Sequence, residues 1–152
     1  MTDIDQFVTA ARSFRAFMRA ANDLDLEARL REARTHVLVL YAAGTKLPHW
    51  FELGVRDKVS LPDEPREALV GFGKHDFYWE VFDPYQEAPL VGGALSDDLG
   101  DIAADLALGM AYWDAGFSDQ AVWEWSFHFD AHWGDHAVDA LRALHRACNP
   151  TR

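Results

Sequence analysis

The side chains best suited to chemistry lie in the last third of the chain, where three histidines recur every four residues. They are His128, His132 and His136, in the segment WEWSFHFDAHWGDH at residues 123–136. This spacing places side chains on one side of a helix. The same segment holds three tryptophans and two phenylalanines, which are costly to leave in water. It is therefore either the centre of the core or the wall of a site.

A second stripe of ionisable side chains lies upstream, at Asp98, Asp101 and Asp105. Spacings of three and seven residues put these acids on one face of a helix. Two helices that each present His or carboxylate groups at this spacing can build a metal site, since each turn contributes one ligand. The candidate metal ligands are Asp101, Asp105, His128, His132, Asp135 and His136. Imidazoles with carboxylates suit zinc, manganese or iron. No cofactor is predicted otherwise, so a divalent metal is the one that the pattern suggests.

The same two stripes have other interpretations. Charged faces opposite apolar ones are typical of surface helices, and the histidines then only hydrogen-bond to nearby acids. General acid–base catalysis by His and Asp is a third interpretation. The Glu-x-x-His pair of di-iron bundles is absent, and His132–Asp135 and His136–Asp139 give only the weaker His-x-x-Asp. The sequence leaves all three interpretations open.

A separate set of aromatic residues is a candidate binding surface, because Trp and Tyr are enriched where proteins contact partners. Its members are Tyr78, Trp79, Tyr85 and Trp125. The first three lie near prolines in a loop-rich part of the chain, where functional side chains are common. A core that simply uses large residues is the alternative, and it is the interpretation we favour for Trp113, Trp123 and Trp133.

Apolar residues at three- and four-residue spacing predict four long helices to position these side chains. They cover about residues 4–21, 24–43, 96–115 and 118–147. Ser96 and Ser118 are expected to cap the third and fourth helices, and Gly134 is the weakest point of the fourth. The second half of the second helix, HVLVLYAAG, is apolar nearly all round. This composition predicts that the second helix is the most buried of the set.

Residues 47–95 contain five of the six prolines, so their composition differs from that of the predicted long helices. Asp63 and Pro65 predict a short helix near residues 64–70. The segment FYWEVF either pairs with PLVGG as a small β ribbon or forms a tucked loop. The predicted fold is all-α: residues 1–152 form a single-domain up-and-down bundle of four long helices, with this proline-rich segment as an irregular crossover.

Composition limits the classes of partner. The net charge of −11 and a pI near 4.9 argue against nucleic acid and anionic membranes, which would repel the chain. A single cysteine, Cys148, excludes an intramolecular disulfide and suits a reducing compartment. The N-terminus does not resemble a signal peptide, and no run approaches the ~20 apolar residues of a membrane span. We therefore expect a cytoplasmic monomer or homodimer that binds an unknown protein or small molecule.

Two long segments resemble a known family. They are YWEVFDPYQEAPLVGGALSDDLGDIAADL and AVWEWSFHFDAHWGDHAVDALRALH, and LVLYAAGTKLP fits as well. Together they are similar to a bacterial family of small helical proteins catalogued as domain of unknown function 5063, from about Phe7 to His145. The resemblance implies a compact helical bacterial protein and brings no activity, cofactor or catalytic residue.

The sequence alone favours a non-enzymatic helical binding or interaction domain, because no catalytic signature stands above background. Its expected binding surface is the crossover loop with Tyr78, Trp79 and Tyr85. The alternative, of a different class, is a metal-binding protein or metallohydrolase with a His/Asp site between the third and fourth long helices.

Overall fold

The computed structural model of the chain describes residues 1–49, 52, 57–61 and 71–149. Its elements are α1 (Asp3–Ala20), η1 (Ala21–Asp23), α2 (Leu26–Gly44), η2 (Gly73–His75), β1 (Phe77–Glu80), β2 (Val91–Ala94), α3 (Leu95–Asp114), α4 (Ser118–His128), η3 (Phe129–Trp133) and α5 (Gly134–Cys148). Helices dominate, so the all-α prediction is confirmed. The short helix expected near residues 64–70 lies outside the described residues.

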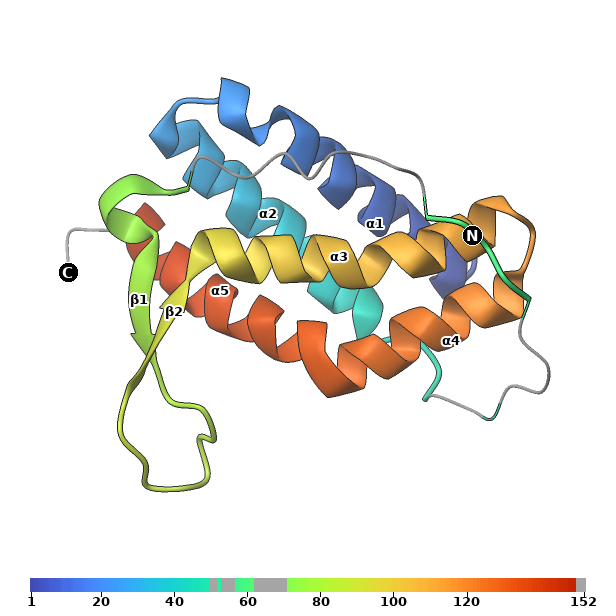
Figure 1. Ribbon diagram of the computed structural model, residues 1–152. Coiled ribbons are helices and arrows are strands. Elements are labelled where there is room, and N and C mark those ends of the chain that lie inside the picture. The colour runs from blue at the N-terminus through green and yellow to red at the C-terminus, as the bar shows by residue number, and fades with distance from the viewer. Residues whose placement is uncertain (50–51, 53–56, 62–70, 150–152) are drawn as a thin grey trace.

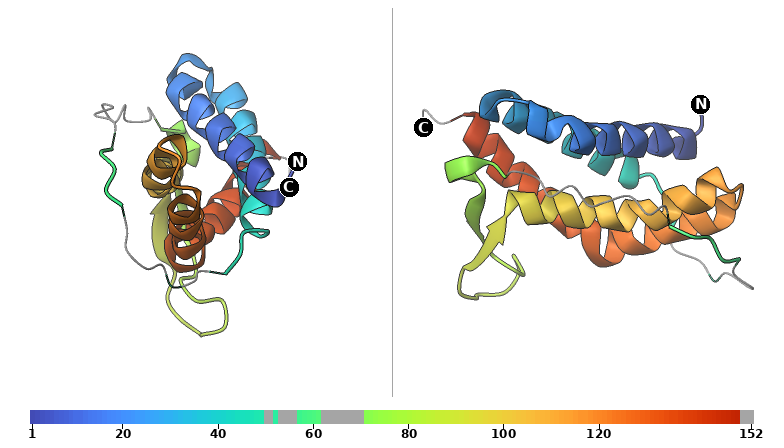
Figure 2. Two further views of the ribbon diagram at one scale, coloured as in Figure 1. Left: turned by 90° about the vertical axis from the view of Figure 1, so that its right-hand side faces the viewer. Right: turned by 45° about the horizontal axis from the view of Figure 1, so that its top comes forward.

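The four long helical runs pack as two hairpins. Helix α1 packs against α2 and α3, α3 packs against α4 and α5, and α2 packs against α5. Figures 1 and 2 show the α1–α2 hairpin lying over the hairpin formed by α3 with α4 and α5. Within the described residues, no helix is both long enough and apolar enough to cross a membrane.

Local sequence sets where the first two helices begin. Thr2 and Asp5 form a capping box at the start of α1, where each side chain bonds the other's backbone N–H. Asp25 caps α2 by accepting a 2.8 Å hydrogen bond from the N–H of Ala28. Carboxylates at both starts also suit the positive end of the helix dipole.

The expectation that α2 would be the most buried helix is wrong. Val37 and Leu40 are fully buried, but Leu38 is 54% and Val39 51% exposed. Helix α2 packs on α1 and α5 along one stripe, so the extra apolar residues of HVLVLYAAG face outward. An apolar run longer than the helix–helix contact leaves part of its surface in solvent.

Helix α3 starts one residue earlier than the sequence predicts, and its start is capped from a distance. Ala94 is the N-cap and makes no side-chain cap bond, so the role assigned to Ser96 was wrong. Instead the carboxylate of Asp76, just before β1, accepts hydrogen bonds from the Ser96 hydroxyl (2.9 Å) and backbone N–H (3.0 Å), and the Asp76 backbone carbonyl accepts one from the N–H of Leu95 (2.9 Å). Asp76 thereby fixes the β ribbon to the start of α3.

Of the two alternatives that the sequence gives for this segment, a β ribbon or a tucked loop, the structure contains the ribbon. Strands β1 and β2 are antiparallel, with Tyr78 opposite Gly93 and Glu80 opposite Val91. Side chains alternate between the two faces of a strand, so Tyr78 and Glu80 face the helices while Phe77 and Trp79 face outward, as their burial shows. The ribbon and its loop project from the end of the bundle (Figure 1).

The fourth long helix changes direction at a π-helical turn (Figure 1). Helix α4 passes into η3 and then α5, and the N–H of Gly134 reaches the carbonyl of Phe129, five residues back. A Cβ at Gly134 would lie 2.4 Å from that oxygen, so only glycine fits. Gly134 is therefore the residue that permits the turn. Ser118 is the first residue of α4, and its predicted capping role was wrong because the N-cap is Phe117.

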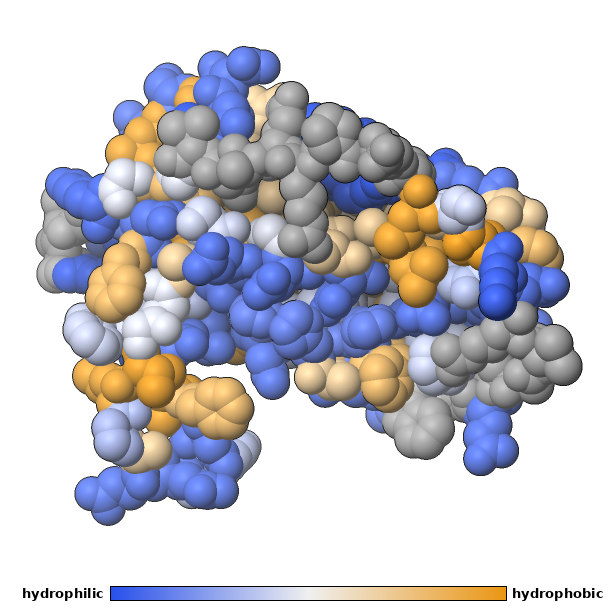
Figure 3. All heavy atoms as spheres, viewed as in Figure 1, coloured by the Kyte–Doolittle hydropathy of each residue, from blue (hydrophilic) through white to orange (hydrophobic). Residues whose placement is uncertain are grey.

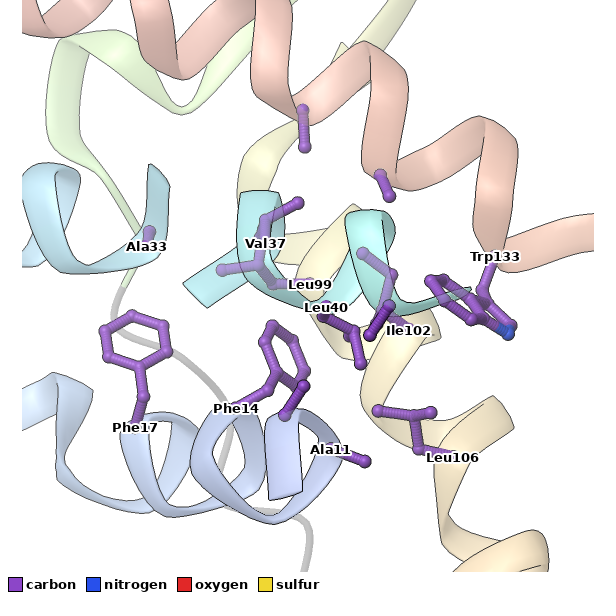
Figure 4. Packing of buried hydrophobic residues seen from close by; sticks show 14 of the residues in the cluster. Ala11, Phe14, Phe17, Ala33, Val37, Leu40, Leu99, Ile102, Leu106 and Trp133 are labelled. Carbon is purple, nitrogen blue, oxygen red and sulfur yellow. The ribbon is translucent and has the colours of Figure 1, made fainter. Parts of the chain in front are cut away.

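Two tryptophans of this helix occupy the centre of the core. Trp125 and Trp133 are both fully buried, and the Phe7 ring lies 5.0 Å and 6.1 Å from them. Figure 4 shows Trp133 beside Leu106 among the aliphatic side chains of α2 and α3. The core interpretation is thus confirmed for Trp133. Trp125, by contrast, was predicted to lie on a binding surface and does not.

Two glycines of α3 give a matched test of this packing. A Cβ at Gly109 would lie 2.2 Å from Nε1 of Trp125, whereas a Cβ at Gly100 would meet nothing within 4 Å. We expect Gly109→Ala to cost about 3 kcal/mol through overpacking. Gly100→Ala should stabilise the helix by about 0.5–1 kcal/mol. Urea unfolding of both variants measures this, and equal effects would contradict the close approach of α3 and α4.

Candidate metal centre

The histidine stripe and the aspartate stripe meet where α3 runs antiparallel to η3 and α5. His132 Nδ1 lies 2.7 Å from Asp105 Oδ2, and His136 Nδ1 lies 2.8 Å from Asp98 Oδ1. The two helices neighbour each other along this line (Figure 1). The register of the two helices pairs one histidine with one aspartate at each helical turn. The sequence predicts which helix face carries these residues, but it does not predict which histidine lies opposite which aspartate.

Each of these hydrogen bonds fixes the orientation of an imidazole. Carboxylates only accept, so Nδ1 of His132 and of His136 carries the proton and donates it. When such a ring is neutral, its Nε2 carries a lone pair that can accept a hydrogen bond or bind a metal ion. Histidines that bind metals show this same arrangement, with the opposite ring nitrogen held by a carboxylate.

The two Nε2 atoms converge. His136 Nε2 lies 3.2 Å from His132 Nε2 and 3.6 Å from Asp101 Oδ2. One ligand atom from each of these three residues falls within 4.8 Å of the others. Two nitrogens bound at about 2.0–2.1 Å to a tetrahedral ion lie about 3.3 Å apart. The observed separation of 3.2 Å is compatible with a shared ion and also with a hydrogen bond between the two rings.

The remaining predicted ligands lie outside this triad. Asp105 holds His132 from behind. His128 points elsewhere, with Nε2 3.4 Å from Glu124 Oε2 and Nδ1 3.8 Å from Asp105 Oδ1. Asp135 is exposed and is not part of the cluster. The structure thus brings together Asp101, His132 and His136 from the six candidates.

Burial and hydrogen bonding shape the electrostatics behind His136. Asp98 is buried, and burial raises its pKa more than the hydrogen bonds from Tyr78 and His136 lower it. Burial also lowers the pKa of His136, but the hydrogen bond and charge of Asp98, with Asp101 and Glu80, raise it above the usual value. The Tyr78 hydroxyl donates to Asp98 Oδ2 at 2.5 Å. Burial and this bond raise the pKa of Tyr78, so it stays a neutral donor.

A pair of carboxyl groups beside this chain of contacts was not among the predicted site residues. Burial raises the pKa of Asp139 to about 7, aided by the charge and hydrogen bond of Glu80 and by the charge of Asp98. Within the described residues, Oε2 of Glu80 is buried without a hydrogen-bond partner. The alternation of Tyr78 and Glu80 in β1 was the available signal, because it places both on the face toward α3 and α5.

The predicted aromatic binding set is divided by the structure. Trp125 is fully buried and packs against Trp113 and Phe7, so it cannot contact a partner at the surface. Tyr78 is half-buried and its hydroxyl contacts Asp98 of the His/Asp cluster. Trp79 is 65% and Tyr85 96% exposed on the projecting ribbon and loop. Only the last two are positioned as an exposed surface.

The fold and the His/Asp cluster define the class: a helical bundle with an interhelical His/Asp cluster beside a small β ribbon. Residues 2–148 match the model of the family described as domain of unknown function (DUF5063), and the chain belongs to that family. The crystal structure of protein BF1032 from Bacteroides fragilis has the same fold, with a TM-score of 0.77 and 20% sequence identity over 96% of this chain and 92% of that chain. Comparison with curated proteins gives no match.

The carboxyl of Asp139 should make stability depend on pH. It keeps its proton up to a pH of about 7 in the folded protein, against 3.8 ordinarily. The folded state therefore binds more protons between these values, and stability falls as pH rises through them. We expect Asp139→Asn to gain roughly 1–2 kcal/mol at pH 8, allowing for solvent screening, and little at pH 4.

Thermal unfolding in the presence of a chelator, at several pH values, measures this effect. Asp135→Asn is the matched control, since Asp135 is an exposed acid of the same helix, and it should show a much smaller dependence. A constant difference between Asp139→Asn and the wild type at all pH values would show that the carboxyl is ionised normally.

Proposed function

We propose that this protein binds one divalent transition metal through His132 Nε2, His136 Nε2 and an oxygen of Asp101. The observation that carries the proposal is the 3.2 Å separation of the two Nε2 atoms, each on a ring whose Nδ1 is held by a carboxylate. Two lone pairs facing each other at this distance repel unless a cation lies between them. A proton or a metal ion can fill that role.

A proton between the rings would create one imidazolium, which Asp98 and Asp101 would stabilise by their charge. A metal ion would in addition use Asp101, 3.6 Å from His136 Nε2, as a third ligand, and this donor set is why we favour the ion. Buried Asp98, supported by Tyr78, acts as the carboxylate that orients one ligand, and Asp105 orients the other. Such outer partners raise the basicity of a ligating imidazole.

The ligand set indicates an ion with open coordination positions. Two histidines and one carboxylate suit zinc, iron(II) or manganese and leave room for water or a ligand atom. The side chains of His132 and Asp101 are each 48% exposed, so solvent reaches the site. A hydrolytic role, in which the ion lowers the pKa of bound water, is the enzymatic form of this proposal.

Metal titration of chelator-treated protein without a histidine tag tests the proposal. We expect one equivalent of zinc or iron(II) to bind and to raise the melting temperature. Asp105→Asn should weaken binding by about 10–100-fold, as losses of outer partners do. His132→Ala, His136→Ala and Asp101→Asn should weaken it further.

His145→Ala is the matched control, because His145 is an exposed histidine of the same helix outside the triad. It should bind metal like the wild type. Less than a tenth of an equivalent in the wild type, or equal losses for His145→Ala and His132→Ala, would overturn the proposal.

A second candidate function, an interaction domain, is supported by the projecting ribbon. Phe77, Trp79, Phe82 and Tyr85 are 59%, 65%, 87% and 96% exposed. At about 200 Å² per ring this amounts to roughly 600 Å² of exposed aromatic surface. Monomeric proteins rarely expose a larger apolar patch than this. A stable interface buries about 800 Å² per partner, so these aromatic side chains would supply most of the area that an interface needs. Figure 3 shows apolar side chains gathered on the ribbon, and we propose a second copy of the chain as their partner.

Light scattering over a wide range of protein concentrations tests this candidate. The wild type should be a dimer, and the double variant Trp79→Ser with Phe82→Ser a monomer that unfolds at an unchanged temperature. Leu38→Ser is the control, because Leu38 is 54% exposed on α2, away from the ribbon. A wild type that stays monomeric, or a dimer that survives the double substitution, would contradict it.

A further inference from the structure

A hollow of about 340 Å³ opens between η2, β1 and the last turns of α5, apart from the metal centre. Three of its lining side chains are basic: Lys74, His75 and Arg146. Phe77 and Tyr78, from opposite faces of β1, and two alanines of α5 complete the lining. No acidic side chain lines it, although the chain carries 25 acidic and 14 basic residues.

Among the described residues, Lys74 and Arg146 are not paired with acidic side chains, in contrast to Arg12 and Arg31. Arg12 pairs with Asp114 at 2.8 Å, and Arg31 pairs with Glu27 at 2.6 Å. In the part of the chain that the structure describes, Lys74 and Arg146 have no acidic partner, and Arg146 only makes a 3.4 Å bond to the carbonyl of Asn149. Unpaired cations facing one hollow leave a positive charge that a ligand can neutralise.

Interaction with the helix dipole does not account for this grouping. A cation in the last turn of a helix is favourable, which explains Arg146 at the end of α5. It does not explain Lys74 and His75, which come from η2, a different element. Their convergence on the same hollow is a property of the tertiary fold.

We infer that this hollow binds a small organic anion with a planar ring, such as an aromatic carboxylate or a phosphate monoester. Lys74 and Arg146 would hold the anionic group through charge-assisted hydrogen bonds. The Tyr78 ring, on the face of β1 toward the helices, would pack against the flat part of the ligand. A volume of about 340 Å³ suits a small ligand, since ligand sites span about 300–1,000 Å³.

Calorimetric titration of the metal-free protein with phenyl phosphate, benzoate and uncharged benzyl alcohol tests the site. At least one of the two anions should bind saturably and benzyl alcohol should not, and the stronger anion identifies the headgroup. Lys74→Gln and Arg146→Gln should each weaken binding by about tenfold or more, the size of one charge-assisted hydrogen bond.

Arg12→Gln is the control for charge, because it makes the same change in net charge at the surface of α1. It should leave affinity within about twofold, since exposed charges this far away are screened. Saturable binding of neither anion, binding of benzyl alcohol as tight as that of the anions, or equal losses for Arg12→Gln would overturn the inference. Metal-free protein keeps this result independent of the metal proposal.

Discussion

The close approach of α3 to the α4–η3–α5 helix is the constraint on which the other features depend. At Gly109 the absence of a side chain lets the Trp125 indole lie against the α3 backbone, where Nε1 reaches the carbonyl of Leu106 at 3.4 Å. A tight contact at that point fixes both the distance and the register of the two helices. The aspartates of α3 then fall opposite the histidines one helical turn after another. The core packing and the candidate site are therefore one arrangement, and not a site added to an independent fold.

The π-helical turn adds the second part of that constraint. The extra residue in this turn rotates the side chains of α5 about the helix axis relative to those of α4. His128 precedes the turn and contacts Glu124, whereas His132 and His136 converge on each other. Of three histidines at equal spacing in the sequence, only two therefore converge through Nε2, while His128 is joined to them through the Asp105 carboxylate. Gly134 makes this possible, because any side chain there would collide with the carbonyl of Phe129.

These contacts show which features of the fold and of the candidate site can be predicted from the sequence. Helical periodicity placed the two ionisable stripes on helix faces, and it placed Trp133 in the core, because both follow from 3.6 residues per turn. It could not reveal that Tyr78 contacts Asp98, since 20 residues and a ribbon separate them. Nor could it distinguish Trp125, which fills the space above a glycine, from an exposed tryptophan such as Trp79. Such assignments depend on which helix lies opposite, which no local pattern contains. Leu38 is apolar but exposed, so the hydrophobicity of a residue likewise does not tell whether a neighbouring helix covers it.

The charge distribution links the two proposed sites. A net charge of −11 creates a field that favours cations near the α3–α5 face, where Asp98, Asp101, Asp105 and Asp139 gather. The same field repels anions over most of the surface. An anion site therefore requires a local excess of basic groups without acids beside them. The hollow at Lys74 and Arg146 meets that requirement. Tyr78 joins the two, because its ring lines the hollow while its hydroxyl holds Asp98 behind His136. A ligand that moved this ring would alter the support of a metal ligand. Coupling between sites is reciprocal in free energy, so an ion at the triad would in turn change the affinity of the hollow.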